Sequence, residues 1–209
     1  MSLRTSWMLV LLASACAAVG GAWAARDLGR TPAAVPQLAS GTWLPERRSA
    51  GDFTLTDQSG APFTQASLAG GPSILTFGFT HCPDVCPATL AMLARVSRAP
   101  GVPPVRVIFV TVDPERDTPP LLDSYVKAFD PRFIALTGAP AAIRAFAERL
   151  GVGYQRDALP GGDYTIDHTA VAFLIDPEGR IAAIFTAPFD AARFAADLRR
   201  AAPFLAVHG

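Results

Sequence analysis

The chain has 209 residues, of which half are hydrophobic and 17% are charged. Its 18 Lys and Arg residues balance 18 Asp and Glu residues, so no net charge is available to attract nucleic acid or an acidic partner. Beyond the hydrophobic N-terminus and the segment that follows it, ~160 residues remain, which suits one domain that buries its own core.

The N-terminal segment predicts export of the domain across a membrane. Residues 7–25 form an uncharged, mostly apolar run that is long enough to cross a bilayer as a helix. Trp7 and Trp23 lie near its ends, where the aromatic residues of a membrane helix gather. We expect residues 1–30 to be a retained anchor in a bacterial-type inner membrane, with the domain facing the periplasm. A cleaved signal peptide, or a lipid on Cys16, are the alternatives.

The remaining elements follow in chain order. Residues 31–50 contain three prolines and no periodic pattern, so we expect a flexible tether. Residues 51–203 are expected to form the folded domain, and within it the polar segment 155–167 is expected to be an exposed, mobile loop. The apolar patterns predict strands at 52–57, 73–79, 105–112, 171–176 and 181–185, and helices at 88–98, 119–129, 140–150 and 190–201.

This order of elements predicts the fold class. A strand–helix–strand unit implies a parallel, right-handed crossover, and the hairpin of the last two strands implies antiparallel neighbours. We therefore expect an α/β domain with a thioredoxin-like mixed central sheet, flanking helices and an N-terminal β-hairpin. One membrane-anchoring helix is expected to precede it.

Two cysteines of the expected domain carry its chemistry. Cys82 and Cys86 are so close in sequence that a disulfide between them closes a very small loop and adds little stability. Such a pair indicates a metal site or a redox pair. Pro87 suits the first position of a helix, which predicts Cys86 at the N-cap. Free backbone N–H groups and the helix dipole would favour a thiolate there.

A metal held by two thiolates needs a further ligand, and imidazole suits both copper and zinc. The penultimate residue His208 is expected to be frayed, and the side chain of His81 should point away from Cys82. His168 precedes the strand expected at 171–176. In a thioredoxin-like sheet the loop before that strand faces the cysteine turn, where thioredoxins usually have a cis-proline. His168 is therefore a candidate third ligand, and a structural histidine with no metal is the alternative that the residues alone leave open.

These residues carry a family resemblance. The segment Phe-Gly-Phe-Thr-His-Cys-Pro-Asp-Val-Cys-Pro at 77–87 resembles the signature of the SCO/SenC family of copper-binding proteins. Asp-Pro-Glu-Arg-Asp-Thr at 113–118, Leu-Thr-Gly at 136–138 and Asp-His-Thr at 167–169 resemble later signatures of that family. The resemblance runs from about Gly51 to Phe194 in the family's order and spacing.

The resemblance implies a copper metallochaperone without catalytic residues. Carried over by position, Cys82, Cys86 and His168 would bind Cu(I) or Cu(II). The implied function is assembly of the dinuclear copper centre of cytochrome c oxidase. The expected partners are the copper-centre subunit of that oxidase, other periplasmic copper carriers and the membrane, through the N-terminal helix; nucleic acid is not expected.

Other interpretations remain open at this point. Cys82 and Cys86 would equally serve a thiol–disulfide oxidoreductase that reduces the copper-site cysteines of the oxidase subunit. A peroxidase of the peroxiredoxin type is disfavoured, because Thr80 lies two residues before Cys82 and that family requires three. Asp113 and Asp117 are either turn and capping residues or groups that orient His168 or meet a partner. Asp167 is a further candidate to orient His168.

Overall fold

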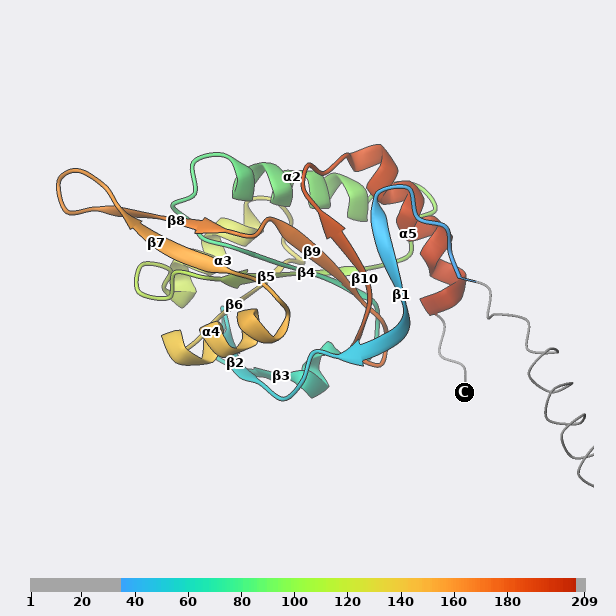
Figure 1. The fold of residues 1–209 in the computed structure, drawn as a ribbon, viewed down its shortest axis with the longest axis horizontal. Helices are drawn as coiled ribbons and strands as arrows, with labels where there is room; N and C mark the ends of the chain where they lie inside the picture. Colours follow the sequence, from blue (N-terminus) through green and yellow to red (C-terminus); the bar gives the residue numbers. More distant parts are fainter. Residues whose placement is uncertain (1–34, 206–209) are drawn as a thin grey trace, which may run out of the picture. The chain divides into compact units, whose positions relative to one another are not determined.

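A computed structural model describes residues 35–205 of the chain (Figure 1). The predicted anchor or signal segment at residues 1–30 lies outside the described residues, as does His208. Within residues 35–205, no helix combines the length and the apolar character needed to cross a membrane.

An eight-stranded mixed sheet forms the centre of the domain (Figure 1). Its strands are β1 (Gly41–Ser49), β2 (Thr54–Asp57), β3 (Pro62–Thr64), β4 (Ser73–Gly78), β5 (Arg106–Thr111), β6 (Ile134–Thr137), β9 (Val171–Ile175) and β10 (Arg180–Thr186). They are ordered β1-β10-β9-β4-β5-β6-β2-β3. The pairs β4–β5 and β5–β6 are parallel and the other pairs are antiparallel. The mixed sheet and the N-terminal hairpin, β2–β3, are confirmed.

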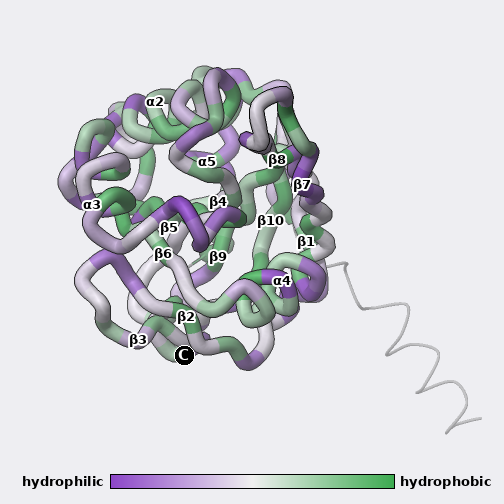
Figure 2. Tube along the Cα trace, turned by 90° about the vertical axis from the view of Figure 1, so that its left-hand side faces the viewer, coloured by the Kyte–Doolittle hydropathy of each residue, from purple (hydrophilic) through white to green (hydrophobic). Residues whose placement is uncertain are grey.

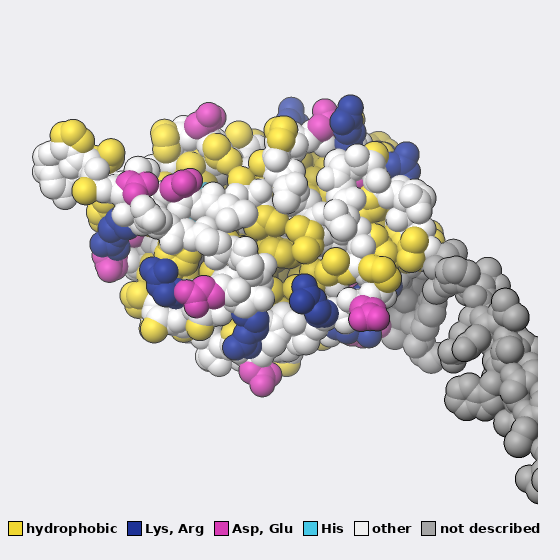
Figure 3. Space-filling view, viewed as in Figure 1, with side chains coloured by type: hydrophobic (Ala, Val, Ile, Leu, Met, Phe, Trp, Pro, Cys, Tyr) yellow, Lys and Arg dark blue, Asp and Glu magenta, His cyan; other side chains and the backbone are white. Residues whose placement is uncertain are grey.

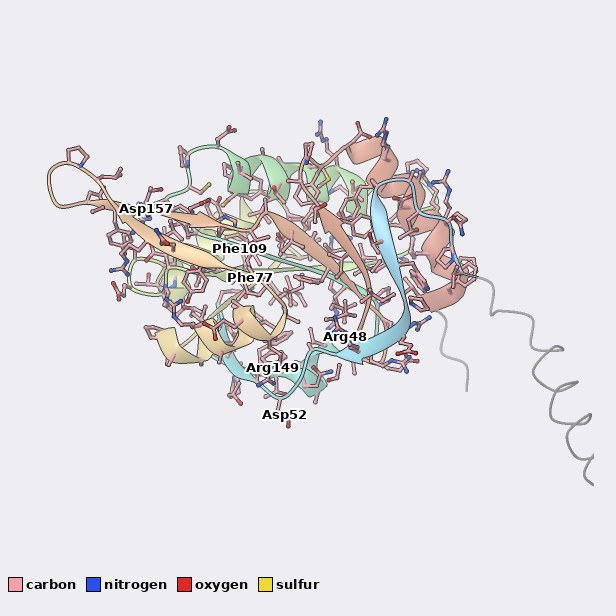
Figure 4. All side chains as sticks on the ribbon, viewed as in Figure 1. Arg48, Asp52, Phe77, Phe109, Arg149 and Asp157 are labelled. Carbon is pink, nitrogen blue, oxygen red and sulfur yellow. The ribbon has the colours of Figure 1, made fainter. Side chains whose placement is uncertain are left out.

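Helices cover both faces of this sheet. They are α2 (Val85–Ser97), α3 (Pro119–Lys127), α4 (Pro140–Arg149) and α5 (Ala191–Leu205), with a short 3-10 helix at Gln65–Leu68. Successive residues of a strand point to opposite faces of the sheet. Phe109 on β5 is paired with Thr76 on β4, so Phe109 and the next β4 residue, Phe77, point to opposite faces. Phe109 joins the apolar cluster of α2, α3 and α5, whereas Phe77 joins that of α4 (Figure 4). In Figure 2, which colours the trace by hydropathy, β9 and β10 are largely hydrophobic, in agreement with the burial of most of their residues.

Residues 41–49 are a strand of this sheet, so the prediction of a flexible tether at 31–50 is wrong for them. β1 pairs antiparallel with β10, and its register shifts after Trp43 in a stretch that contains Pro45. A proline is tolerated at such an irregularity on an edge strand because no ladder hydrogen bond is lost. The ring of Trp43 lies 6.0 Å from that of Phe204 on α5, measured between ring centroids. The folded domain therefore includes residues before 51.

The prediction of a mobile loop at 155–167 is also wrong. β7 (Tyr154–Ala158) and β8 (Tyr164–His168) pair antiparallel as a separate two-stranded sheet. Gly161 and Gly162 at its turn have φ angles of 89° and 85°, which glycine adopts without strain. This hairpin extends beyond the helices at the left of Figure 1. Its polar composition reflects exposure of most of its side chains and not a lack of regular structure.

Asp197 on α5 anchors the chain just before β1. Its fully buried carboxylate accepts hydrogen bonds from the backbone N–H groups of Ala39 and Ser40, both at 2.7 Å, and from the Ser40 hydroxyl at 2.7 Å. Arg200 donates to it at 3.0 Å. Burial by itself raises the pKa of Asp197, but the donated hydrogen bonds outweigh burial and hold the pKa below its ordinary value.

We predict that Asp197→Ala lowers the free energy of unfolding by about 2–4 kcal/mol, because the backbone N–H groups of Ala39 and Ser40 lose a buried, charged acceptor. Asp123→Ala, which removes only the surface pair with Lys127, is the matched control and should cost at most about 1 kcal/mol. Urea denaturation measures the free energy of unfolding of both variants.

Since the folded pKa of Asp197 is lowered, its contribution to stability is present above pH ~4 and is lost as the pH falls further. Equal losses in the two variants would contradict this anchor.

Candidate metal centre

The cysteine turn connects β4 to α2. Asp84 is the N-cap of α2, so Cys86 is the second helical residue and not the N-cap that the sequence predicts. The Cys82 backbone N–H donates to the Phe79 carbonyl at 3.3 Å, and this turn lets the helix begin before the cysteine. Pro87 is accommodated in the first helical turn, where a missing N–H breaks no helix hydrogen bond.

The structure brings Cys86 into contact with His168 and places Cys82 beside Cys86 in the turn, although the three donor atoms do not all lie within 4.8 Å of one another. The Cys86 sulfur lies 3.4 Å from His168 Nε2, across 82 residues of sequence. The Cys86 backbone N–H lies 3.4 Å from the Cys82 sulfur, to which it donates. Both cysteines are free thiols; Cys86 is buried and Cys82 is half-buried. The start of α2 and the end of β8 therefore meet at one sulfur–imidazole contact.

Electrostatics make this contact a neutral pair. Burial, and then the neighbouring Cys82, raise the pKa of the Cys86 thiol, so the predicted activated thiolate at Cys86 is wrong for the metal-free protein. Burial also lowers the pKa of His168. Its Nδ1 lies 3.3 Å from the Thr169 carbonyl, which only accepts, so a hydrogen bond there requires the proton on Nδ1. In that tautomer Nε2 carries a lone pair that faces the Cys86 thiol.

Close packing holds the Cys86 sulfur in place. A Cβ atom added at Gly78, the last residue of β4, would lie 2.9 Å from this sulfur and 2.7 Å from the Phe109 ring. The Phe79 ring meets the His168 ring edge-on, with centroids 6.2 Å apart. A glycine at position 78 is therefore required for the sulfur to pack against the sheet.

Asp117 orders the turn that carries Cys82. Its fully buried carboxylate accepts hydrogen bonds from the Thr80 backbone N–H at 3.1 Å, the Thr80 hydroxyl at 2.5 Å and the Thr111 hydroxyl at 2.6 Å. Asp117 thus contacts the cysteine turn and not His168. The roles of Thr80 and Thr111 were not predicted, since no local pattern marks a threonine as a partner of a distant carboxylate.

Asp113 contacts the hairpin instead. Its buried carboxylate accepts hydrogen bonds from the Tyr164 hydroxyl at 2.8 Å and from Arg116 Nε at 2.5 Å. Asp167 is exposed, and it acts on His168 through its charge, which raises the pKa of the imidazole against the larger effect of burial. Tyr164 is a residue of the site that was not predicted. Tyr164, Ile166 and His168 alternate with other residues at a spacing of two, and this alternation could have predicted a strand.

His81 belongs to a hydrogen-bonded network. Within residues 35–205, the one group of His, Cys, Asp or Glu residues whose donor atoms all lie within 4.8 Å of one another is His81, Asp113 and Asp117. Hydroxyl, N–H and guanidinium donors already occupy both carboxylates. His81 Nδ1 lies 3.1 Å from the Thr80 hydroxyl. We assign no metal to this group.

The surface around His168 and part of the cysteine turn are exposed to solvent. A shallow groove of about 470 Å³, lined by residues 153–155 and 167–169, opens beside His168. Pro83, Asp84 and Val85 in the cysteine turn are exposed. On the face shown in Figure 3, acidic and basic side chains are interspersed, so no single sign of charge dominates it.

We predict that Gly78→Ala lowers the free energy of unfolding by about 1–3 kcal/mol, because the added methyl group overlaps the Cys86 sulfur and the Phe109 ring. Gly71→Ala is the matched control, since a Cβ there meets no atom within 4 Å. Urea denaturation of the reduced protein compares them. If the two variants were equally stable, the packing around the sulfur would be looser than described.

Comparison with known proteins identifies relatives along most of the chain. Residues 43–203 match the family model SCO1/SenC. The bovine mitochondrial protein named SCO2 homolog is 37% identical over 205 residues, which cover 92% of this chain and 72% of that protein. The mitochondrial protein SCO2 of Saccharomyces cerevisiae is 41% identical over 135 residues, 62% of this chain and 45% of that protein. The chain thus spans less than half of the yeast relative.

Solved structures agree with the sequence match. The structure of Bradyrhizobium japonicum ScoI with copper bound is 41% identical and superposes with a TM-score of 0.65, over 73% of this chain and 98% of that one. Arabidopsis thaliana ScoI with copper bound is 35% identical with a TM-score of 0.69, over 74% and 98%. With the family model matching most of the sequence and these folds matching the domain, the chain belongs to the SCO1/SenC family.

Proposed function

We propose that this protein is a copper metallochaperone that carries one copper ion on Cys82, Cys86 and His168. It delivers the ion to the copper-centre subunit of cytochrome c oxidase during assembly. The observation that carries this proposal is the 3.4 Å approach of His168 Nε2 to the Cys86 sulfur. Two similar proteins have been solved with copper bound, which supports copper as the cargo.

The donor set fits this cargo. Thiolate sulfur and imidazole nitrogen are ligands that Cu(I) and Cu(II) both accept. The metal displaces thiol protons, so binding releases protons and strengthens as the pH rises. Because burial raises the pKa of Cys86, copper must supply the energy that removes its proton. Neutral His168 already offers a lone pair, and its low pKa keeps that lone pair free of protons.

Delivery requires that the ion leave by ligand exchange. Cys82 is the more exposed sulfur, and it lies on the turn whose residues 83–85 are exposed. A partner's ligands would replace Cys82 first, while Cys86 and His168 still hold the ion. Residues 1–30 would anchor the domain to the inner membrane or direct it to the periplasm. There, other periplasmic copper carriers would load it.

A thiol–disulfide oxidoreductase is the second candidate, favoured by the accessibility of Cys82 beside a second free thiol. In that reaction the Cys82 thiolate attacks a disulfide of the oxidase subunit and forms a mixed disulfide. The Cys86 thiolate then attacks the mixed disulfide, which releases the substrate as a dithiol and leaves a Cys82–Cys86 disulfide in this protein. The raised pKa of Cys86 slows this second step, because the thiolate is the attacking form. The chemistry also gives His168 no ligand role, so the chaperone is the better account.

We predict that the reduced full chain in detergent binds one copper per protein under anaerobic titration. Cys82→Ser, Cys86→Ser and His168→Ala should each weaken binding by more than the ~10–100-fold that loss of an outer-shell partner costs. His81→Ala is the matched control and should bind as the wild type does. Undiminished binding by His168→Ala would contradict the three-ligand site.

A second prediction separates chaperone from reductase. The copper-loaded protein should transfer its ion to the apo copper-centre domain of the oxidase under reducing conditions, since ligand exchange needs no electrons. His168→Ala should lose this transfer and keep thiol–disulfide exchange with a model disulfide. If cells that contain His168→Ala assemble active oxidase normally while cells with Cys82→Ser do not, the reductase is the correct function.

A further inference from the structure

We propose that Asp113, Arg116 and Tyr164 form a latch that positions His168 opposite the cysteines. The three are positioning residues and not ligands. This inference rests on the proposed function for its effect on copper. The latch itself is a property of the metal-free fold and is testable without copper.

The hairpin that carries His168 needs such an attachment. Within the described part of the chain, β7 and β8 pair with each other and with no strand of the eight-stranded sheet. A two-stranded hairpin alone is only marginally stable in water. Ile166 is buried in the apolar cluster of α4, which ties the middle of β8 to the body. Apolar contact is non-directional, so Ile166 does not fix where the strand ends. Two other attachments of the hairpin, the Arg156–Glu115 ion pair at 2.7 Å and Arg144 over the Tyr154 ring at 4.6 Å, are made by exposed or half-buried side chains and contribute little.

The latch supplies directional contacts at the start of β8. The Tyr164 hydroxyl donates to Asp113 Oδ1 at 2.8 Å, and Arg116 Nε donates to Asp113 Oδ2 at 2.5 Å. Arg116 Nη1 also donates to the Tyr164 carbonyl at 3.0 Å. The Arg116 guanidinium lies 3.7 Å from the centre of the Tyr164 ring, and that of Arg156 lies 4.0 Å from it. Tyr164 is therefore held by its hydroxyl, its ring and its backbone at once.

The same turn of the chain holds both halves of the site. Asp113 and Asp117 lie in the segment 113–118 after β5, and both are fully buried. Asp117 binds Thr80 next to the cysteine turn, and Asp113 binds Tyr164 on the hairpin. Tyr164 and His168 lie on the same face of β8, ~13 Å apart along the strand. The segment 113–118 thus sets the cysteine turn and the histidine strand relative to one another.

The affinity for copper depends on the fraction of molecules in which the hairpin is in place. A molecule whose hairpin has moved away offers two thiols and no imidazole. The apparent dissociation constant equals the intrinsic constant divided by the latched fraction. A broken latch therefore weakens copper binding even though all three ligands remain in the chain.

The test compares Tyr164→Phe with Tyr154→Phe in the full chain in detergent. Tyr164→Phe removes the hydrogen bond to Asp113 and keeps the ring. Tyr154 lies opposite His168 in the hairpin, and its hydroxyl makes no hydrogen bond within residues 35–205, so Tyr154→Phe is the matched control. In the metal-free protein, amide hydrogen exchange of β7 and β8 should be about tenfold faster in Tyr164→Phe and unchanged in Tyr154→Phe.

Copper affinity and copper spectra provide the second measurement. Tyr164→Phe should bind Cu(II) about tenfold more weakly. Its electron paramagnetic resonance and thiolate-to-copper absorption should also shift toward those of His168→Ala, which a purely structural role would not cause. Hydrogen exchange and copper spectra that match the wild type would overturn the latch and leave the proposed function standing. If the wild type bound no copper, the proposed function would fail, and hydrogen exchange alone would still decide the latch.

Discussion

The proposed metal site depends on a single contact between sulfur and imidazole. The 3.4 Å approach of His168 Nε2 to the Cys86 sulfur joins the first turn of α2 to the last residue of β8. Neither element makes the site alone. The sheet places β4, which leads to the cysteines, beside β9, which follows His168, and the two strands pair antiparallel. The distance between the ligands is therefore a property of the whole sheet and not of either motif.

Burial gives the metal-free site its chemical character. Apolar surroundings raise the pKa of Cys86 and lower that of His168, so both groups are neutral where they meet. A neutral resting pair needs no counter-ion and resists wasteful reaction of the buried thiol. In the proposed function, the half-buried Cys82 would be the ligand nearest to solvent where the ion enters and leaves.

The sequence predicted the parts of this structure whose signals are local. The buried strands β4, β5, β9 and β10 were recognisable as apolar runs, and prolines marked the starts of α3 and α4. The position of His168 before β9, together with the family resemblance, predicted its approach to the cysteine turn, and the structure places it against Cys86. Here local pattern and global fold agree.

The rest depended on contacts that no local pattern encodes. β1 was not predicted because it contains Pro45, and the register shift that accommodates this proline forms only when β1 pairs with β10. The polar hairpin β7–β8 resembles a loop in composition, and the short strand β6 was not recognised. The position of Cys86 inside the helix, and the partners that Asp113 and Asp117 choose, follow from the way the segment 113–118 packs between two distant parts of the chain.

X-ray absorption at the copper edge tests the central claim most directly. For the anaerobic Cu(I)-loaded full chain, the account predicts two sulfur ligands and one imidazole nitrogen. The nitrogen should disappear in His168→Ala and persist in His81→Ala. A wild-type spectrum with sulfur ligands alone, or one that His168→Ala leaves unchanged, would contradict the account, since the contact between α2 and β8 would then have no part in holding the metal.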